Sequence, residues 1–293
     1  MHFAFRRAVR TIDSHTEGNS TRVIVGGYPI PPGETLLERR EWLWHNDDGL
    51  RRMLNFEPRG HGMMCSALLM APFSADADFS LIIMEQDEYV PMSGTSVLGV
   101  ATTVVSTGMV PVIEPVTTVR LETPAGMVAC DVDVRDGAVG EASFVNVESF
   151  LLHKSAAITV QGLGDVMVDV AYGGDFYAFV DADLLGLALL PSNEAQLVAM
   201  ANRILPELNR QLAVRHPLRP DIDRCYMMLF TSARTTTGDL KQTIVAPPGG
   251  LDRSPCGTGT SARIALLHAT GRLPLGKSLK FEGVLGTYFT GAA

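Results

Sequence analysis

Cysteine is scarce in this chain, and its spacing excludes several kinds of site. The four cysteines are Cys65, Cys130, Cys225 and Cys256. They form no C-x-x-C pair and no metal-ligand spacing. The sequence also lacks a G-x-G-x-x-G motif after a predicted strand, which argues against a nucleotide cofactor. We therefore expect reduced thiols, no metal and no cofactor.

Long apolar runs and excess positive charge are also missing. No stretch approaches the ~18 uncharged apolar residues that a membrane helix needs, and the opening residues MHFAFRRAVR lack the apolar core of a secretory signal. A net charge of −8 disfavours nucleic acid and anionic membranes as partners. With 293 residues, 46% of them hydrophobic, the chain predicts a cytoplasmic globular protein whose partner is a small molecule.

Short β-branched runs with alternating polarity predict many strands, among them FSLIIM, VTTVRLE, VACDVDV, VMVDVAY and QTIVAP. Helices are expected over residues 61–70, 94–107, 193–214 and 257–270. The mixture predicts an α+β fold.

An internal repeat organises these elements. SGTSVLGVATTVVSTGMVP (93–111) aligns without a gap over CGTGTSARIALLHATGRLP (256–274). Each copy has a small polar residue, Gly-Thr, an apolar helix, a Thr-Gly end and a proline stop. LETPAG (121–126) echoes FEGVLG (281–286), and DSHTEG (13–18) echoes DVAYGG (169–174). The sequence thus predicts two similar halves. The second copy ends sooner after this echo than the first, so the chain is expected to be a few strands short.

The repeat places Ser93 and Cys256 at the N-terminal ends of two buried apolar helices. Backbone N–H groups there lack intrahelical partners, and the helix dipole is positive. If the two ends face one another, the N–H groups of Gly94, Thr95, Gly257 and Thr258 can bind one carboxylate and stabilise charge on its α-carbon.

Cys256 and Ser93 are the candidates for proton transfer. A helix N-terminus is expected to lower the pKa of the Cys256 thiol, which makes it an acid or base on one face of the α-carbon. Ser93 would serve the other face. The alternative is that Cys256 only caps its helix, and that Ser93 is only a good N-cap residue. Asp252, whose counterpart is Tyr89, suits a substrate ammonium.

The remaining candidates are weaker. His15 and His61 lie beside glycines in loop-like sequence, where either a site role or a structural role is open. Cys65, Cys130 and Cys225 are expected to pack in the core.

At these residues the sequence resembles the proline racemase family. The resemblance spans the chain and includes DSHTEGNSTRVI (13–24), EPRGHGMM (57–64), PMSGTSVLGVAT (91–102), DVAYGGDFYAFVD (169–181) and DRSPCGTGTSARIALLHATG (252–271). It implies the diaminopimelate-epimerase-like fold, with two pseudo-symmetric domains, each a β-barrel-like sheet around a central helix, and an active site in the cleft between them. The expected domains are residues 1–115 with 277–293, and residues 116–276. A homodimer is the assembly considered.

The resemblance also implies the site. Racemases of the family carry Met-Cys-Gly-His where this chain has Met92-Ser93-Gly94-Thr95, so Ser93 replaces the first catalytic cysteine. Cys256 matches the second, Asp252 matches the residue that holds the substrate nitrogen, and His61 is assigned to substrate binding.

Serine is a much weaker acid than cysteine, which disfavours plain two-thiol racemisation of proline. The expected function is dehydration of trans-3-hydroxy-L-proline to Δ1-pyrroline-2-carboxylate, with or without 2-epimerase activity. Ser93 is the expected acceptor for the L-substrate and Cys256 the donor. The alternatives are a 4-hydroxyproline 2-epimerase and a non-catalytic imino-acid binder.

Overall fold

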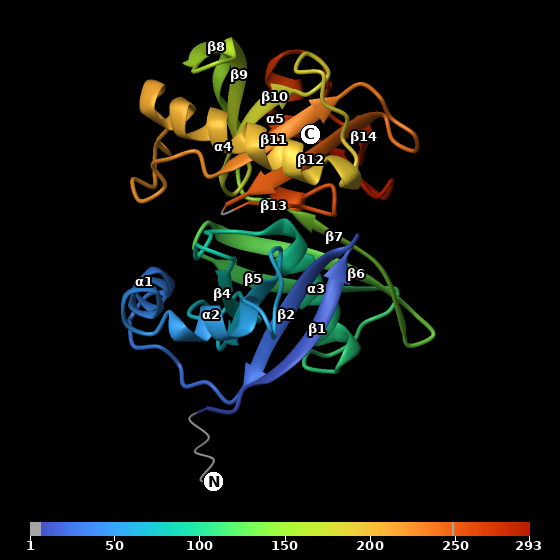
Figure 1. Cartoon of the computed structure of the whole chain (residues 1–293). Coiled ribbons are helices and arrows are strands. Elements are labelled where there is room, and N and C mark those ends of the chain that lie inside the picture. Colours follow the sequence, from blue (N-terminus) through green and yellow to red (C-terminus); the bar gives the residue numbers. More distant parts are fainter. Residues whose placement is uncertain (1–6, 248) are drawn as a thin grey trace. The chain divides into compact units, whose positions relative to one another are not determined.

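The computed structural model describes residues 7–247 and 249–293. Residues 1–6, on which the expected lack of a secretory signal partly rests, lie outside the described residues. The chain forms two compact units (Figure 1). Unit 1 comprises the N-terminal residues up to Thr16 and Ser20–Val145, and unit 2 comprises Glu17–Asn19 and Asn146–Ala293. In the described part, no helix is long and apolar enough to cross a membrane.

Unit 1 is built on a seven-stranded sheet whose spatial order equals its order in sequence, β1 to β7. Its strands are β1 (Arg10–Thr16), β2 (Asn19–Gly26), β3 (Cys65–Met70), β4 (Phe79–Met84), β5 (Val116–Thr123), β6 (Gly126–Arg135) and β7 (Ala138–Val145), and its helices are α1 (Leu36–Asn46), α2 (Gly49–Asn55) and α3 (Gly94–Ser106).

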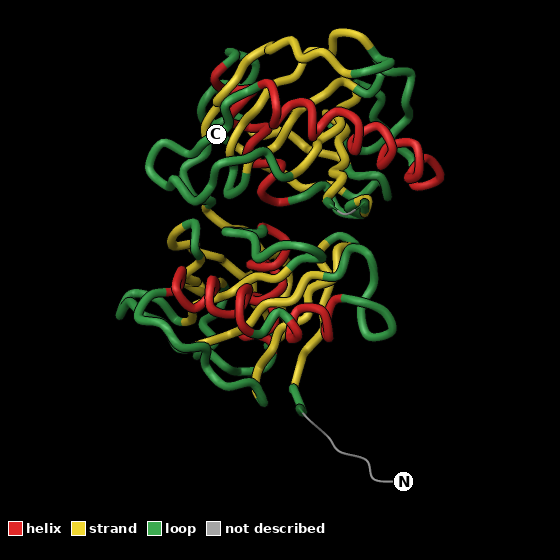
Figure 2. The backbone as a smooth tube through the Cα atoms, turned by 60° about the vertical axis from the view of Figure 1, so that its left-hand side comes forward, coloured by secondary structure: helices red, strands yellow, loops and turns green. Residues whose placement is uncertain are grey.

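Unit 2 contains an eight-stranded sheet with the order β15-β14-β12-β11-β10-β9-β8, in which β13 pairs with β12. Its strands are β8 (Phe150–Val160), β9 (Gly164–Tyr172), β10 (Phe176–Asp181), β11 (Met227–Ser232), β12 (Leu240–Ala246), β13 (Gly250–Leu251), β14 (Ser278–Glu282) and β15 (Tyr288–Ala292). The helices are the short η1 (Pro191–Asn193), α4 (Glu194–Gln211) and α5 (Gly257–Ala269). Figure 2 shows how few helices accompany the strands of each unit.

Strand pairing confirms the internal repeat. In unit 1, β2 pairs with β3 in parallel, β3 with β4 antiparallel, β4 with β5 in parallel and β5 with β6 antiparallel. In unit 2, β10, β11, β12, β14 and β15 follow one another with the same alternation. Even the register is shared, because Leu121 lies opposite Phe79 just as Phe281 lies opposite Leu240.

The echoed glutamates occupy equivalent places in the two sheets. Glu122 of β5 accepts hydrogen bonds from the backbone N–H groups of Phe73 (2.8 Å) and Ser74 (2.7 Å). These N–H groups belong to the turn between β3 and β4. The carboxylate therefore fastens this turn to the neighbouring parallel strand.

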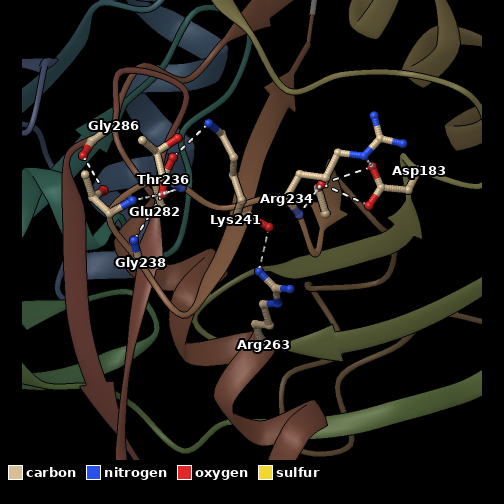
Figure 3. A network of polar contacts seen from close by, with 10 residues as sticks. Asp183, Arg234, Thr236, Gly238, Lys241, Arg263, Glu282 and Gly286 are labelled. Carbon is tan, nitrogen blue, oxygen red and sulfur yellow. Dashed lines mark hydrogen bonds and ion pairs between the residues drawn. The ribbon is translucent and has the colours of Figure 1, made fainter.

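Glu282 of β14 does the same in unit 2, where it accepts from the N–H groups of Thr236 and Thr237 at 2.6 Å (Figure 3). Here the side chain is fully buried, and Lys241 of β12 donates to it at 2.8 Å. Although burial opposes ionisation, the bonds from Lys241 and the turn lower the pKa of Glu282 to about 2. An ion pair thus anchors the turn in this copy.

The two repeated helices are the central helices of their units, as predicted. Helix α3 packs against β1, β6 and β7, and α5 packs against β8, β9 and β15. Both are buried over most of their length. Their apolar surface is covered by the strands of their own unit, and this fixes the position of each N-terminal end.

Two expectations differ from the structure. Residues 61–70 form a turn and the buried strand β3 rather than a helix, because a short apolar run fits a buried strand as well as a helix. The units divide at Val145 rather than near residue 115, and residues 277–293 belong to unit 2. The reason is pairing: β5–β7 extend the first sheet, and β14–β15 extend the second.

Candidate active site

Ser93 is the N-cap residue of α3, as predicted, and has extended backbone angles (φ −135°, ψ 118°). Its side chain makes no capping bond with the helix. The hydroxyl lies 3.4 Å from that of Thr95, and the Thr95 carbonyl accepts from the Thr16 hydroxyl at 3.2 Å. Ser93 is 6% exposed. Unit 1 therefore places a hydroxyl group that is not used for capping beside the first N–H groups of a buried helix.

Cys256 occupies the equivalent N-cap position of α5, but its backbone is left-handed, with φ 64° and ψ 122°. This region is unfavourable for a residue with a Cβ. Two bonds hold the conformation: the Cys256 N–H donates to Ser254 Oγ at 3.0 Å, and the Gly259 N–H donates to Cys256 Sγ at 3.3 Å. Strain of this kind gathers at functional sites, which supports a role for the thiol beyond capping.

Asp252 is built into the same turn. Its Oδ1 accepts from the N–H and the hydroxyl of Ser254 at 2.8 and 2.9 Å, and its own N–H donates to the Ile244 carbonyl of β12 at 2.9 Å. The side chain is buried, and this burial raises the pKa of Asp252 to about 6 although the bonds from Ser254 oppose the change. Unit 2 therefore brings Asp252, Cys256, Gly257 and Thr258 together.

The predicted lowering of the Cys256 pKa was wrong. Burial and, second to it, the nearby Asp252 carboxyl raise the pKa of Cys256 to about 12, despite opposing hydrogen bonds from Tyr177, Gly259 and Thr258. The helix-terminus argument considered the N–H groups alone and omitted the cost of removing a thiolate from water. Cys256 is consequently a thiol at neutral pH in the free protein.

Tyr177 is a residue that the sequence analysis did not select. It lies on β10, and its hydroxyl is 3.6 Å from Cys256 Sγ and 2.5 Å from Thr258 Oγ1. Burial, then the proximity of Cys256, raises the pKa of Tyr177 well above its usual range. The available signal was its position in DVAYGGDFYAFVD (169–181), one of the segments that carry the resemblance to the proline racemase family.

The two histidines differ in their surroundings. His61 precedes β3 and is half-buried; its Nε2 lies 3.1 Å from Ser20 Oγ, and its Nδ1 accepts from the Met63 N–H at 3.2 Å. His15 is exposed on β1. The bonds of His61 give it a structural role in its loop, and its contact with substrate stays a prediction.

The other three cysteines are buried and free of disulfides, which confirms the prediction that they pack in the core. Burial raises the pKa of Cys130 to about 12. In the described part of the chain, no group of three or more His, Cys, Asp or Glu side chains is placed to hold a metal ion.

A cavity of about 540 Å³ lies in unit 2 between β9, β10 and the second half of α5. Buried Arg263 and the side chains of Leu266 and Leu267 line it. Ser232, at its rim, donates to Asp183 at 3.0 Å. The predicted site residues are not among those that line this cavity.

Known proteins are similar to this sequence over almost its whole length. A family model described as Proline racemase matches residues 11–293, a span that contains both helix N-termini. The chain belongs to the proline racemase family. Among its relatives, a 4-hydroxyproline 2-epimerase of Streptosporangium roseum is 43% identical over 98% of this chain and 86% of its own length. A proline racemase of Clostridioides difficile is 38% identical, with the same coverage.

Solved structures of the proline racemase family match this fold. A hydroxyproline epimerase from Agrobacterium vitis, with bound trans-4-hydroxy-L-proline, superimposes with a TM-score of 0.91 at 35% identity, covering 98% of this chain and 84% of that one. A probable proline racemase from Agrobacterium radiobacter, with bound carbonate, gives 0.91 at 35% identity. These matches confirm the predicted two-domain α+β fold.

Proposed function

We propose that this protein is a hydroxyproline 2-epimerase acting on 4-hydroxyproline, with Ser93 and Cys256 as its two proton-transfer groups. One observation carries the proposal: the internal repeat places one exchangeable proton at the same N-cap position of each unit, Ser93 Oγ on α3 and Cys256 Sγ on α5. Inversion of an α-carbon requires one group to remove a proton and another to return one on the opposite face. Relatives named for the epimerase and the racemase support this choice.

Binding precedes proton transfer. The first N–H groups of α3 and α5, those of Gly94, Thr95, Gly257 and Thr258, suit the substrate carboxylate because they point out of helix N-termini. Asp252 suits the ring ammonium. When these two charges pair, the effect of the Asp252 carboxyl on Cys256 is cancelled and the thiolate becomes easier to form.

The chemistry is one exchange of protons. The Cα–H bond breaks, its proton passes to the base, and the electron pair delocalises into the carboxylate, where the helix N–H groups stabilise the added charge. The acid then protonates Cα from the other face. In one direction Cys256 is the base and Ser93 the acid, and the reverse direction exchanges these roles. We assign Ser93 as the proton acceptor for the L-substrate.

Dehydration of trans-3-hydroxy-L-proline is the second candidate, and Ser93 favours it because a hydroxyl is a weak base for inversion. In this reaction Cα loses its proton, the C3–O bond breaks, the departing hydroxide takes a proton to leave as water, and the enamine tautomerises to Δ1-pyrroline-2-carboxylate. The named relatives favour epimerisation.

Proton NMR in deuterium oxide distinguishes these reactions. Trans-4-hydroxy-L-proline, trans-3-hydroxy-L-proline and L-proline are incubated separately with the protein. We expect the 4-hydroxy compound to give its C2 epimer with deuterium at Cα, and the Cys256→Ala variant to give none. An imine from the 3-hydroxy compound, with no change in the 4-hydroxy compound, would establish the dehydratase instead. Ligand binding without α-deuterium exchange in any of the three would identify a non-catalytic binder and overturn both reactions.

A further inference from the structure

Two hydroxyl groups lie close to the Cys256 sulfur. Tyr177 OH is 3.6 Å and Thr258 Oγ1 is 3.8 Å from Sγ, and the two oxygens are 2.5 Å apart. Tyr177 is 1% exposed and Thr258 is 2% exposed. A hydroxyl pair that excludes water and contacts a candidate acid–base sulfur has a defined electrostatic effect on that sulfur.

The number of hydrogens determines the effect. Each hydroxyl carries one hydrogen, and the short bond between Tyr177 and Thr258 uses one of the two. If Tyr177 donates to Thr258, the Thr258 hydrogen is left for the sulfur; if Thr258 donates, the Tyr177 hydrogen is left. In both arrangements one hydroxyl hydrogen is available to Sγ, in addition to that of the Gly259 N–H at 3.3 Å.

Within the described residues, unit 1 differs at the position that corresponds to Tyr177. Thr21 is the counterpart of Tyr177, since the DSHTEG and DVAYGG segments align them and each lies opposite the first residue of the next strand, Cys65 or Met227. The buried Thr21 hydroxyl has no hydrogen-bond partner within the described part of the chain. The repeat therefore gives the extra hydroxyl donor to the sulfur side.

We propose that Tyr177 is a positioning residue that, together with Thr258, stabilises the Cys256 thiolate during proton transfer. The inference deepens the proposed function and rests on it for the identity of the reaction. Whichever direction the reaction takes, Cys256 is a thiolate before or after the step, and this is the state that a hydroxyl donor favours. The hydrogen bond to the thiolate also restricts rotation of the Cys256 side chain.

Alkylation by iodoacetamide tests the inference without any substrate. The rate at Cys256 is followed by mass spectrometry of its peptide at one pH of about 9, well below the pKa of the thiol. Loss of one hydrogen bond to the thiolate raises the thiol pKa by about one unit, which lowers the thiolate fraction about tenfold. A more basic thiolate is more nucleophilic, so the net decrease expected for the double variant Tyr177→Phe/Thr258→Val, which removes both hydroxyls, is about threefold. Tyr177→Phe alone leaves the Thr258 hydrogen for the sulfur at 3.8 Å and should give a smaller decrease.

Tyr172→Phe is the matched control. Tyr172 is a buried tyrosine on the adjacent strand β9, and its hydroxyl has no hydrogen-bond partner among the described residues. We expect its alkylation rate to equal that of the wild type. A second comparison guards against changes of packing: in the Tyr177→Phe background, Thr258→Val should slow alkylation about threefold relative to the wild type, whereas Thr258→Ser, which keeps a hydroxyl, should not.

Equal alkylation rates in Tyr177→Phe/Thr258→Val and the wild type would overturn the inference, whatever the substrate is, and a double variant no slower than Thr258→Val alone would exclude a contribution of Tyr177. A slower rate without epimerisation of any hydroxyproline would instead overturn the proposed function and leave the inference standing. In the active enzyme, Tyr177→Phe/Thr258→Val should lower kcat up to about tenfold, and Tyr177→Phe alone by less, with KM unchanged, because both hydroxyls act through the sulfur. An increase in KM with unchanged kcat would contradict this role.

Discussion

Replacing Asp252 by asparagine should stabilise the protein at neutral pH while it lowers activity. In the folded protein Asp252 is buried, and its pKa is raised from 3.8 to about 6. Above pH 6 the folded state therefore holds an ionised carboxyl that has lost most of its hydration. Asparagine keeps an oxygen that can accept both bonds from Ser254 and carries no charge.

The magnitude follows from the pKa shift. About two units at about 1.4 kcal/mol each correspond to about 3 kcal/mol of unfolding free energy lost by ionisation. The new amide N–H₂ has no assured acceptor and costs about 1 to 2 kcal/mol. The expected net gain is about 1 to 2 kcal/mol, which raises Tm by about 2 to 4 °C for each kcal/mol in a domain of this size.

The pH dependence identifies the cause. Between about pH 4 and pH 6 the folded wild type retains the Asp252 proton while the unfolded chain releases it, so stability falls as the pH rises through this window. Asp252→Asn should lack this decrease. Below about pH 4, where the ionisation cost is absent, only the amide cost is left and the variant should be about 1 to 2 kcal/mol less stable than the wild type; its net gain should be complete above about pH 6.

Urea unfolding at several pH values, followed by fluorescence, provides the measurement. Asp223→Asn, which alters an exposed carboxylate, is the control and should change stability by less than about 0.5 kcal/mol. If Asp252→Asn were no more stable than the wild type at pH 7, ionised Asp252 would cost nothing, and the account of its burial would be refuted. The kcat/KM of this variant should fall about 10- to 100-fold, since the ammonium loses a charged partner.

Two further substitutions test how unit 2 holds the site. Glu282→Gln should destabilise the protein by about 3 kcal/mol at neutral pH because Lys241 stays buried without its partner. This loss should shrink in acid unfolding curves as the pH falls from about 4.5 toward 2, since Glu282 contributes stability only while it is ionised; a loss that is constant with pH would contradict the ion-pair account. Gly173→Ala should destabilise by about 1 to 3 kcal/mol and lower kcat, because its Cβ would lie 2.3 Å from the Thr258 carbonyl oxygen and 2.5 Å from the Ala262 nitrogen. Gly62→Ala, whose Cβ meets nothing within 4 Å, should change neither thermal stability nor kcat, and equal effects of the two alanines would refute the steric argument.

The central helices could be predicted because several local signals agreed. Each begins after a small polar residue with Gly-Thr and ends at Thr-Gly before a proline, and its apolar residues cover most of its surface. Helices α3 and α5 end within one residue of the expected ranges. The repeat then added long-range information that local propensity lacks, and the equivalent bonds of Glu122 and Glu282 show that it extends to side chains.

Other features depended on tertiary contacts. Strand β8 was not anticipated because its pairing with β9 shifts register twice, between Leu151 and Ala156, which breaks the alternation. Burial of β3 made it resemble a helix. The pKa of Cys256 depends on Asp252 and on the depth of the turn, which the spacing of residues in sequence does not give. Tyr177 is 79 residues from Cys256, and its contact follows only from the packing of β10 beneath α5.

The most direct test of the central claim is solvent deuterium incorporation at early conversion, with the 2S and 2R forms of 4-hydroxyproline given separately to the wild type, Ser93→Ala and Cys256→Ala. The account predicts that the wild type forms product fully deuterated at Cα while the remaining substrate keeps its proton, and that neither variant forms the epimer. Epimer formation by Ser93→Ala at the wild-type rate would contradict the two-residue mechanism, because inversion would then proceed without the group that unit 1 contributes.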